Sequence, residues 1–236
     1  MPFRSCWWFT CVMKNNRYTI VVAAGSGRRM GAVLPKQFLV VAGKPILMHT
    51  LNRLHTFDRS MSLLLVLHPD YFAYWQEQLE AFAFDVPHTV VGGGEERFHS
   101  VKCALDTITS EHAVVGIHDG VRPFVDVNTL MRCFEMAEKH GSAVPVIAVN
   151  DSVREVQGDV NRATERSNLR IVQTPQCFQL AVLRKAFTQP YSPSFTDDAS
   201  VVESAGYSIQ LVEGNRENIK VTTPEDLRWA EWTLSV

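Results

Sequence analysis

Short apolar runs and amphipathic stretches alternate along most of the chain. The apolar runs are typical of buried strands, and in the stretches between them apolar residues recur every three or four positions, as on one face of a helix. The pattern predicts strands over 18–24, 62–67, 88–91, 113–117, 143–149 and 208–212, and a further extended segment over 218–221. It predicts helices over 45–57, 71–84, 100–109, 126–140 and 180–187, and two more that begin near 196 and at 223. This alternation indicates an α/β fold with a doubly wound, mostly parallel sheet that binds ligands at the carboxyl ends of its strands.

Several helix ends carry recognisable boundary residues. Ser100 could cap the helix that begins there, because serine side chains accept hydrogen bonds from free N–H groups at a helix start. Gly141 follows the helix over 126–140 at the position where glycine commonly ends a helix. Thr223 followed by Pro224 is a good start for the last helix.

Residues 150–173 break the alternation. They contain short extended runs on either side of Gly158-Asp159, which is a hairpin turn signal, and Leu169–Val172 resembles a returning strand. An extended hairpin with so little apolar content usually lies against something else, often a second subunit. We therefore predict a dimerisation arm here within a single domain over 18–236; the alternative is a surface loop.

The distribution of charge is uneven although the net charge is only −2. No Asp or Glu precedes Asp58, so eight Lys and Arg residues in the first 57 positions are unopposed, while the other 15 face all 25 acids. A net charge near zero argues against a general nucleic-acid or membrane surface, so the cationic cluster is local. The longest apolar run, Leu63–Leu67, is far too short to span a bilayer.

The five cysteines form no CxxC pair, and their odd number leaves a free thiol in any disulfide scheme. This favours a reduced, cytoplasmic protein. Residues 1–17 loosely resemble a signal peptide but lack a small-residue cleavage site. We interpret them as a disordered extension or a misassigned start, with Met13 as the better initiator.

The segment 20–37 reads IVVAAGSGRRMGAVLPKQ and has the composition of a nucleotide site. A strand-like run leads into a turn built on Gly25 and Gly27, followed by paired arginines and Lys36. Such a turn exposes backbone N–H groups, which together with unopposed cations suit a polyphosphate. The segment is neither a P-loop nor a dinucleotide fingerprint, because Met30 stands where both motifs need glycine. An ordinary turn with solvated arginines is the alternative.

Other polar groups follow predicted strands. The triple glycine Gly92–Gly94 lets the backbone approach a flat ligand such as a base. Asp119, trailed by Arg122, follows the strand over 113–117, where it either binds a ligand or caps a turn. Lys220 lies in an apolar run, either as an edge-strand device or as a cation directed into the cleft.

Other catalytic patterns are missing from the sequence. His118 is better explained as a satisfied strand-end histidine than as a base. No His, Cys and Asp grouping has the spacing of metal ligands, and no Ser or Cys lies in a nucleophile-elbow sequence.

Seven ordered blocks carry a resemblance to a known family. They are AAGSGRRM (23–30), PKQ (35–37), GGGEERFHSV (92–101), HDGVRP (118–123), TPQCF (174–178), TDDAS (196–200) and EGNRENIKVTTPEDL (213–227). In this order they resemble the 2-C-methyl-D-erythritol 4-phosphate cytidylyltransferases, nucleotidyltransferases of the non-mevalonate isoprenoid pathway. The departures are mild: Val22 where many members have Pro, Glu95-Glu96 for Asp-Glu, HDGVRP for HDAARP, and Ser152 where some have Thr.

The resemblance implies a Rossmann-like fold of the nucleotide-diphospho-sugar transferase type, a homodimer with exchanged arms, and Mg²⁺-dependent transfer of CMP from CTP. The Mg²⁺ would be held chiefly by the triphosphate, so no metal-binding side chain is expected. The implied CTP-binding residues are Ala23, Ala24, Gly25, Gly27, Gly94, Glu95, Ser100, Asp119 and Gly120. The implied catalytic residues are Arg29, Lys36, Arg166 and Lys220. The acceptor would be positioned by Asp119, Thr196 and Lys220, joined by Ser152, Arg166 and Thr174 from the arm of the other subunit.

Two alternatives stay open. The D-ribitol-5-phosphate cytidylyltransferases share the nucleotide blocks and differ in acceptor contacts. A non-catalytic nucleotide sensor on the same fold is less favoured, because a sensor need not keep Arg29, Lys36 and Lys220 together. The expected partners are CTP and a small sugar-alcohol phosphate.

Overall fold

A single mixed sheet forms the middle layer of the molecule. The computed structural model describes residues 16–25 and 34–235. Within them the sheet contains β1 (Arg17–Val22), β4 (Ser62–Leu67), β5 (Thr89–Gly92), β6 (Val114–Asp119), β7 (Ser142–Ala148), β10 (Arg170–Val172), β11 (Gln176–Gln179) and β12 (Leu211–Glu213). The order is β10-β7-β11-β6-β1-β4-β5, with β12 paired to β7. Strands β6, β1, β4 and β5 run parallel, whereas β11 is antiparallel to both β6 and β7.

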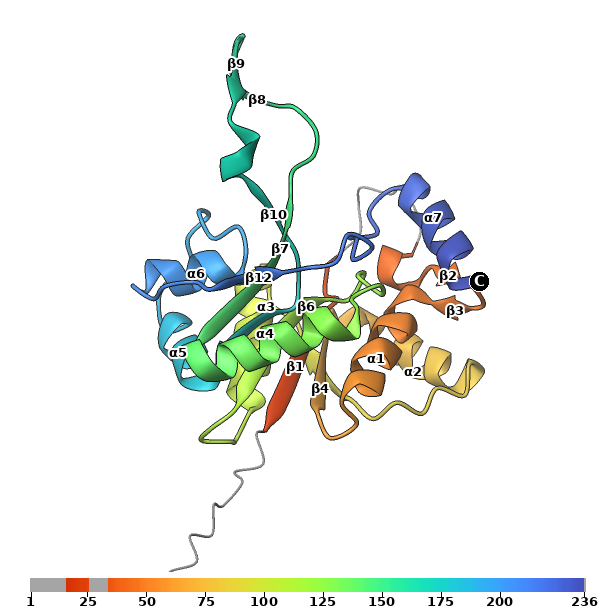
Figure 1. Cartoon of the computed structure of the whole chain (residues 1–236). Helices are drawn as coiled ribbons and strands as arrows, with labels where there is room; N and C mark the ends of the chain where they lie inside the picture. The colour runs from red at the N-terminus through yellow and green to blue at the C-terminus, as the bar shows by residue number, and fades with distance from the viewer. Residues whose placement is uncertain (1–15, 26–33, 236) are drawn as a thin grey trace, which may run out of the picture.

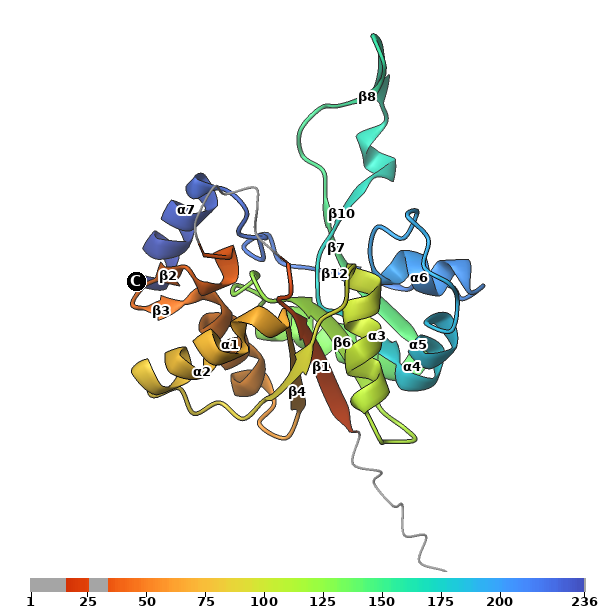
Figure 2. The same ribbon diagram turned by 180° about the vertical axis from the view of Figure 1, so that it is seen from behind.

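Helices cover both faces of this sheet (Figures 1 and 2). The described helices are α1 (Ile46–Phe57), α2 (Phe72–Ala81), α3 (Arg97–Thr107), α4 (Val127–His140), α5 (Leu180–Ala186), α6 (Asp198–Ser204) and α7 (Pro224–Ser235). Helices α1, α2 and α4 contribute to one buried apolar cluster, and α3, α5 and α6 to another on the opposite face. Helix α7 packs on a third, smaller cluster beside the short pair β2 (Val40–Val41) and β3 (Lys44–Pro45).

Alternating side chains of the central strands fill the two large clusters. In β4, Leu63, Leu65 and Leu67 belong to one cluster and Leu64 and Val66 to the other. This is the period of two that a strand buried on both faces imposes. The expected doubly wound α/β fold is therefore confirmed.

The helix boundaries agree with the sequence in most places. Asp126 caps α4 by accepting the N–H of Thr129 at 2.5 Å, and Gly141 ends that helix with φ +91°, a left-handed conformation that favours glycine. The N–H of Asp226 donates to the Thr223 hydroxyl at 3.2 Å at the start of α7. The prediction for Ser100 is wrong, because α3 begins at Arg97 and Ser100 lies inside its first turn.

Other differences concern short strands. Strands β11, β2 and β3 were missed, since each has four residues or fewer and carries little periodicity. Strand β1 starts at Arg17, which we had placed in the extension; its guanidinium donates to Glu138 at 2.9 Å. The segment 218–221 joins no ladder, although the Val221 N–H donates to the Val121 carbonyl at 3.0 Å.

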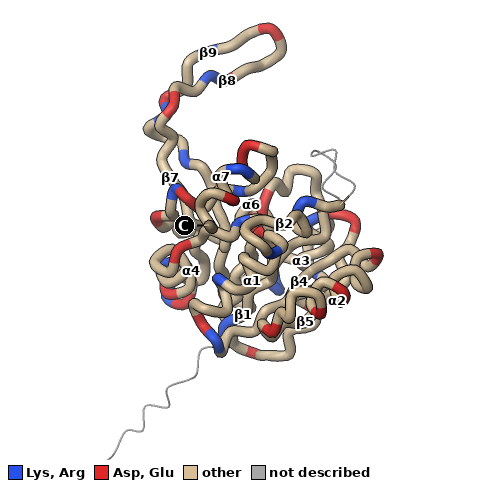
Figure 3. The backbone as a smooth tube through the Cα atoms, turned by 90° about the vertical axis from the view of Figure 1, so that its right-hand side faces the viewer, with Lys and Arg blue, Asp and Glu red and all other residues tan. Residues whose placement is uncertain are grey.

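The segment between β7 and β10 extends away from the rest of the molecule as a hairpin (Figure 1). Strands β8 (Val153–Gln157) and β9 (Val160–Thr164) pair around the Gly158-Asp159 turn, which confirms the predicted hairpin. Charges of both signs lie along it (Figure 3), and Val156 and Val160 are 70% and 73% exposed. Its contact with a second subunit stays a prediction.

No helix among residues 16–25 and 34–235 combines the length and the apolar character that a membrane crossing requires.

Candidate active site at the carboxyl ends of the strands

The buried carboxylate of Asp119 is the centre of a cluster of cations. Asp119 is the last residue of β6, and three side chains reach it from separate segments. Arg97 Nη1 lies 2.8 Å from Oδ1, whereas Arg122 Nε and Lys220 Nζ lie 3.1 and 3.0 Å from Oδ2. Asp119 and Lys220 stand out independently in the sequence, and the structure brings them into contact.

Arg97 also binds a second buried acid. Its Nη2 lies 2.7 Å from Oδ2 of Asp198, the first residue of α6. Asp197 and Ser200 form a capping box at the start of α6 and so fix the helix that carries Asp198. Arg97 thereby joins the segment after the triple glycine to the end of β6 and to α6.

The two acids respond differently to this environment. Burial alone would raise the pKa of Asp119, but Arg97, Lys220 and Arg122 together hold that pKa well below its usual range. Burial raises the pKa of Asp198, and the attraction of Arg97 offsets this only in part. Asp119 is therefore the firmly ionised member of the pair and the anchor for the cations.

A hydrogen-bonded chain supports Asp119 from behind. The Asp119 N–H donates to the Thr174 hydroxyl at 3.1 Å, and that oxygen lies 3.0 Å from Nδ1 of His118. His118 Nε2 lies 3.0 Å from the Arg122 carbonyl. Both ring nitrogens of His118 are thus occupied, and burial lowers its pKa to about 4, as expected for a structural histidine.

This chain corrects the place that we had expected for Thr174. We had placed it on the arm that reaches into the other subunit. It is 5% exposed and hydrogen-bonds the Asp119 of its own chain, because it lies just before β11, which pairs with β6.

The segment before α7 positions Lys220. The carbonyl of Asn218 accepts from Arg122 Nη1 at 2.7 Å, and the Asn218 side chain donates to the Thr174 carbonyl at 2.8 Å. Asn218 is completely buried, so these bonds tie the irregular segment to the end of β6. Lys220, two residues later, keeps 44% of its side chain exposed and can reach a ligand.

The two glycine segments predicted to bind a nucleotide pack against each other. A Cβ built on Gly93 would lie 2.5 Å from the Cβ of Ala24, and one on Gly120 would lie 3.0 Å from the Cβ of Ala23. The N–H of Gly94 donates to the Ser100 hydroxyl at 3.2 Å. The triple glycine thus lies in close contact with the turn after β1, and its approach to a base stays a prediction.

Gln37 supports the start of that turn. Its side-chain amide donates to the carbonyls of Ala23 at 2.7 Å and Gly25 at 3.3 Å, and the residue is 3% exposed. Lys36, the preceding residue, opens a short 3₁₀ helix. Gly27 and Arg29 lie outside the described residues.

Four predicted residues lie apart from the cluster. Ser152 and Arg166 are exposed at the base of the arm, where Arg166 donates to the Asn150 carbonyl. Thr196 is exposed in the loop before α6, two residues from Asp198, and Glu95 is exposed beside the triple glycine.

Arg97, Arg122 and Asp198 belong to the site but were not predicted as members of it from the sequence. All three lie within the blocks that carried the family resemblance, next to residues that were chosen. The available signal was a charged residue close to a chosen one, but only the fold shows that Arg97 and Arg122 bind the Asp119 carboxylate and that Arg97 also binds Asp198.

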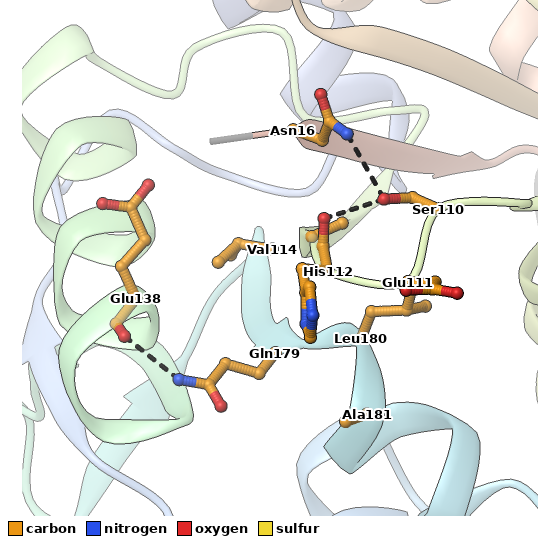
Figure 4. A pocket seen from close by; sticks show the side chains of 10 residues that line it. Asn16, Ser110, Glu111, His112, Val114, Glu138, Gln179, Leu180 and Ala181 are labelled. Atoms are coloured by element: carbon orange, nitrogen blue, oxygen red, sulfur yellow. Dashed lines mark hydrogen bonds between the residues drawn. The ribbon is translucent and has the colours of Figure 1, made fainter. Parts of the chain in front are cut away.

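A separate cavity of about 660 Å³ lies at the other end of the sheet (Figure 4). Asn16 and Val114, at the amino ends of β1 and β6, line it together with residues such as His112, Glu138 and Gln179. It therefore does not belong to the Asp119 cluster, which lies at the carboxyl ends of the same strands.

A family model, sequence relatives and solved structures each match this chain over most of its length. Residues 18–236 match the model of the family described as 2-C-methyl-D-erythritol 4-phosphate cytidylyltransferase. Proteins of that name from Phocaeicola vulgatus and Bacteroides fragilis are 47% and 48% identical, over 92% of this chain and 98% and 99% of theirs. The crystal structure of the protein of that name from Thermus thermophilus has a TM-score of 0.73 at 31% identity, over 94% of this chain and 100% of that one.

Proposed function

The chain belongs to the 2-C-methyl-D-erythritol 4-phosphate cytidylyltransferase family, and we propose that it transfers CMP from CTP to 2-C-methyl-D-erythritol 4-phosphate at the Asp119 cluster. The products are 4-diphosphocytidyl-2-C-methyl-D-erythritol and pyrophosphate. The observation that carries the location is the contact of Lys220 with Asp119 at the carboxyl edge of β6, beside both glycine segments. Ligands of open α/β sheets bind at this edge.

The cluster is suited to substrates that carry several negative charges. Arg97, Arg122 and Lys220 surround Asp119, and Asp119 holds them in place before any phosphate arrives. Such preorganised cations stabilise developing negative charge without reorganising during the reaction. Lys220 is the most exposed of the three and is the best placed to leave Asp119 for a phosphate oxygen.

The reaction needs little acid–base chemistry from the protein. An oxygen of the acceptor phosphate attacks the α-phosphorus of CTP, a new P–O bond forms, and the bond to the β-phosphate oxygen breaks to release pyrophosphate. The nucleophile is already ionised, so positioning and charge stabilisation supply most of the rate enhancement. In this scheme Lys36 and Arg29 bind the triphosphate, whereas Lys220 and Asp119 position the acceptor.

The cytosine and ribose lie along the backbone of the two glycine segments. Ala23, Ala24, Gly25 and Gly120 form one side of this subsite, and Gly94, Glu95 and Ser100 the other. The close approach of Gly93 to Ala24 supports the arrangement, because it brings main-chain groups from both segments together. Gly27 belongs to the phosphate-binding part of the turn.

Mg²⁺ fits this site as a companion of CTP. Among the described residues no group of three or more His, Cys, Asp or Glu side chains could hold a metal ion, and both oxygens of Asp119 already bind cations. Mg²⁺ commonly takes most of its ligands from substrate phosphates and water. When bound, it neutralises charge on the triphosphate.

A second copy of the chain completes the acceptor site in this proposal. Ser152 and Arg166 are exposed on an arm that extends away from its own cluster, and Val156 and Val160 expose apolar surface on the same arm (Figure 1). Arginine suits the acceptor phosphate because its planar guanidinium pairs with two oxygens at once. Thr174 and Thr196 contact the acceptor from the chain that supplies Asp119.

The cytoplasm is the proposed location. Among the described cysteines, Cys103, Cys133 and Cys177 are free thiols. Free thiols are typical of a reducing compartment.

One assay tests the proposed function. Pyrophosphate release is measured with CTP, ATP, GTP and UTP, each paired with 2-C-methyl-D-erythritol 4-phosphate or D-ribitol 5-phosphate. We expect rapid release only with CTP and the methylerythritol phosphate. Faster release with ribitol phosphate would identify the wrong acceptor, and no release with any pair would favour a nucleotide sensor.

A further inference from the structure

We infer that His118 is a positioning residue for the acceptor site. Its neutral side chain connects the main chains of Asp119 and Arg122 through hydrogen bonds. The inference rests on the proposed function, because it assigns a role within that site. His118 is fully buried, so it has no direct access to a substrate.

The hydrogen bonds of His118 define one tautomer. The Arg122 carbonyl can only accept, so Nε2 carries the proton and donates to it at 3.0 Å. Nδ1 is then an acceptor, and the Thr174 hydroxyl donates to it at 3.0 Å. The Thr174 oxygen in turn accepts the N–H of Asp119 at 3.1 Å. All donors and acceptors along this chain are matched.

The chain spans the turn that carries the site. Asp119 and Arg122 lie at its two ends, and both side chains take part in the ion cluster. The Asp119 carbonyl also accepts from the Arg122 N–H at 3.1 Å, so the turn is closed by one direct bond and by one path through His118 and Thr174. Because the position of a side chain depends on its main chain, loss of these hydrogen bonds would displace both the Asp119 carboxylate and the Arg122 guanidinium.

Histidine suits this task better than other polar residues. The connector needs a donor and an acceptor at a fixed separation on a rigid group, and neutral imidazole offers both. Asparagine can supply an acceptor near Nδ1, and glutamine a donor near Nε2, but neither reproduces the ring. Burial keeps the imidazole neutral, which avoids a further positive charge beside Arg97 and Arg122.

The first test compares His118→Asn and His118→Gln with a matched control. His88 is also hydrogen-bonded at both ring nitrogens, to Trp75 at 3.0 Å and to the Val86 carbonyl at 2.8 Å, but it belongs to another part of the fold. We expect each His118 variant to raise KM for the acceptor about tenfold or more, as for loss of one or two positioning hydrogen bonds. KM for CTP should change less, and His88→Gln should leave both constants near wild type. Equal losses in the His118 and His88 variants would overturn the inference.

Two further measurements keep the inference testable if the His118 variants fold poorly. Thr174→Val removes the link to Nδ1 and should change the ¹⁵N resonance of that nitrogen in long-range ¹H–¹⁵N spectra, whereas Thr174→Ser keeps the hydroxyl and should retain that resonance. Long-range ¹H–¹⁵N NMR spectra of the wild-type protein at pH 7 should show a neutral ring protonated at Nε2. A ring protonated at Nδ1 would contradict the inference, whichever acceptor the enzyme uses. Failure of the proposed function would instead appear in the pyrophosphate-release assay of the wild-type protein.

Discussion

Thr174 lies opposite Asp119 in the register that pairs β11 with β6, and its hydroxyl accepts the Asp119 N–H at 3.1 Å. The regular ladder ends two residues earlier on this side, at Gln176 and Ile117. On the other side Asp119 is still in register with Val22 of β1. The Thr174 side chain thus supplies the hydrogen bond to β6 where the backbone ladder with β11 has ended. The carboxyl end of β6 is therefore accessible to side chains from α3 and from the segment before α7.

Replacement of the cations near the glycine turn should slow the reaction strongly. We expect Lys36→Ala and Arg29→Ala each to lower kcat by about 10²–10³, the usual effect of removing one preorganised donor to developing charge. Lys44→Ala, at an exposed lysine of β3, is the matched control and should retain normal turnover. Near-normal turnover in folded Lys36→Ala and Arg29→Ala proteins would contradict the assignment of the triphosphate site.

Cytosine should be selected through the segment 92–100. A site that hydrogen-bonds the amino edge of cytosine is left with unpaired polar groups by uracil, so we expect kcat/KM for CTP to exceed that for UTP by about 10²-fold or more. Gly94→Ala should raise KM for CTP, because its Cβ would lie 2.5 Å from that of His99. Parallel kinetics with the two nucleotides measure both effects; equal use of UTP would show that this segment does not bind the base.

The stability of the protein should fall as the solution is acidified from pH 6.5 to 4. The unfolded chain protonates its histidine near pH 6.5, but folded His118 stays neutral until about pH 4, so protons favour the unfolded state in this window. The free energy of unfolding should therefore fall by up to about 3 kcal/mol from this residue alone. Asp119 adds a small fall in the same direction near pH 4, where an unfolded carboxyl begins to take up protons, and His49 and His88, whose pKa values burial also lowers, add to the slope. The raised pKa of Asp198 acts in the opposite direction, equally in wild type and variant.

Urea unfolding at several pH values tests this prediction. His118→Asn should make the dependence between pH 4 and 6.5 less steep, whereas Gln157→Ala, at an exposed residue without a titratable group, should leave it unchanged. A wild-type slope that persists in His118→Asn would assign the acid sensitivity to other groups.

Co-expression of two impaired variants should restore activity if the arm serves a second subunit. Arg166→Ala should raise KM for the sugar phosphate much more than for CTP, and Asp119→Ala should damage the cleft. A mixed dimer of the two contains one intact site, built from an undamaged arm and an undamaged cleft. Pyrophosphate release from the purified heterodimer measures it, and a heterodimer as inactive as either parent would mean that the arm is only a structural strap.

The sequence predicted the layers of the fold and the chemistry of individual positions, but not the contacts between them. Strong periodicity located α1 and α4, whereas β11 was too short to be recognised. Asp119 and Lys220 were chosen separately because each follows or interrupts an apolar run. Their contact depends on how the sheet brings distant segments together, and so do the roles of Arg97 and Asp198.

The hairpin turn at Gly158-Asp159 lies between the stretches of chain that build the cluster. Arg97, Asp119 and Arg122 precede it, and Asp198 and Lys220 follow it. A protease that cut this exposed turn would leave Asp119 and Lys220 on different fragments, and likewise Arg97 and Asp198. The cut would break no strand of the main sheet. The halves would still share the pairings of β11 and β12 with β6 and β7, so they would stay associated and keep the cluster, whereas neither half alone would contain it.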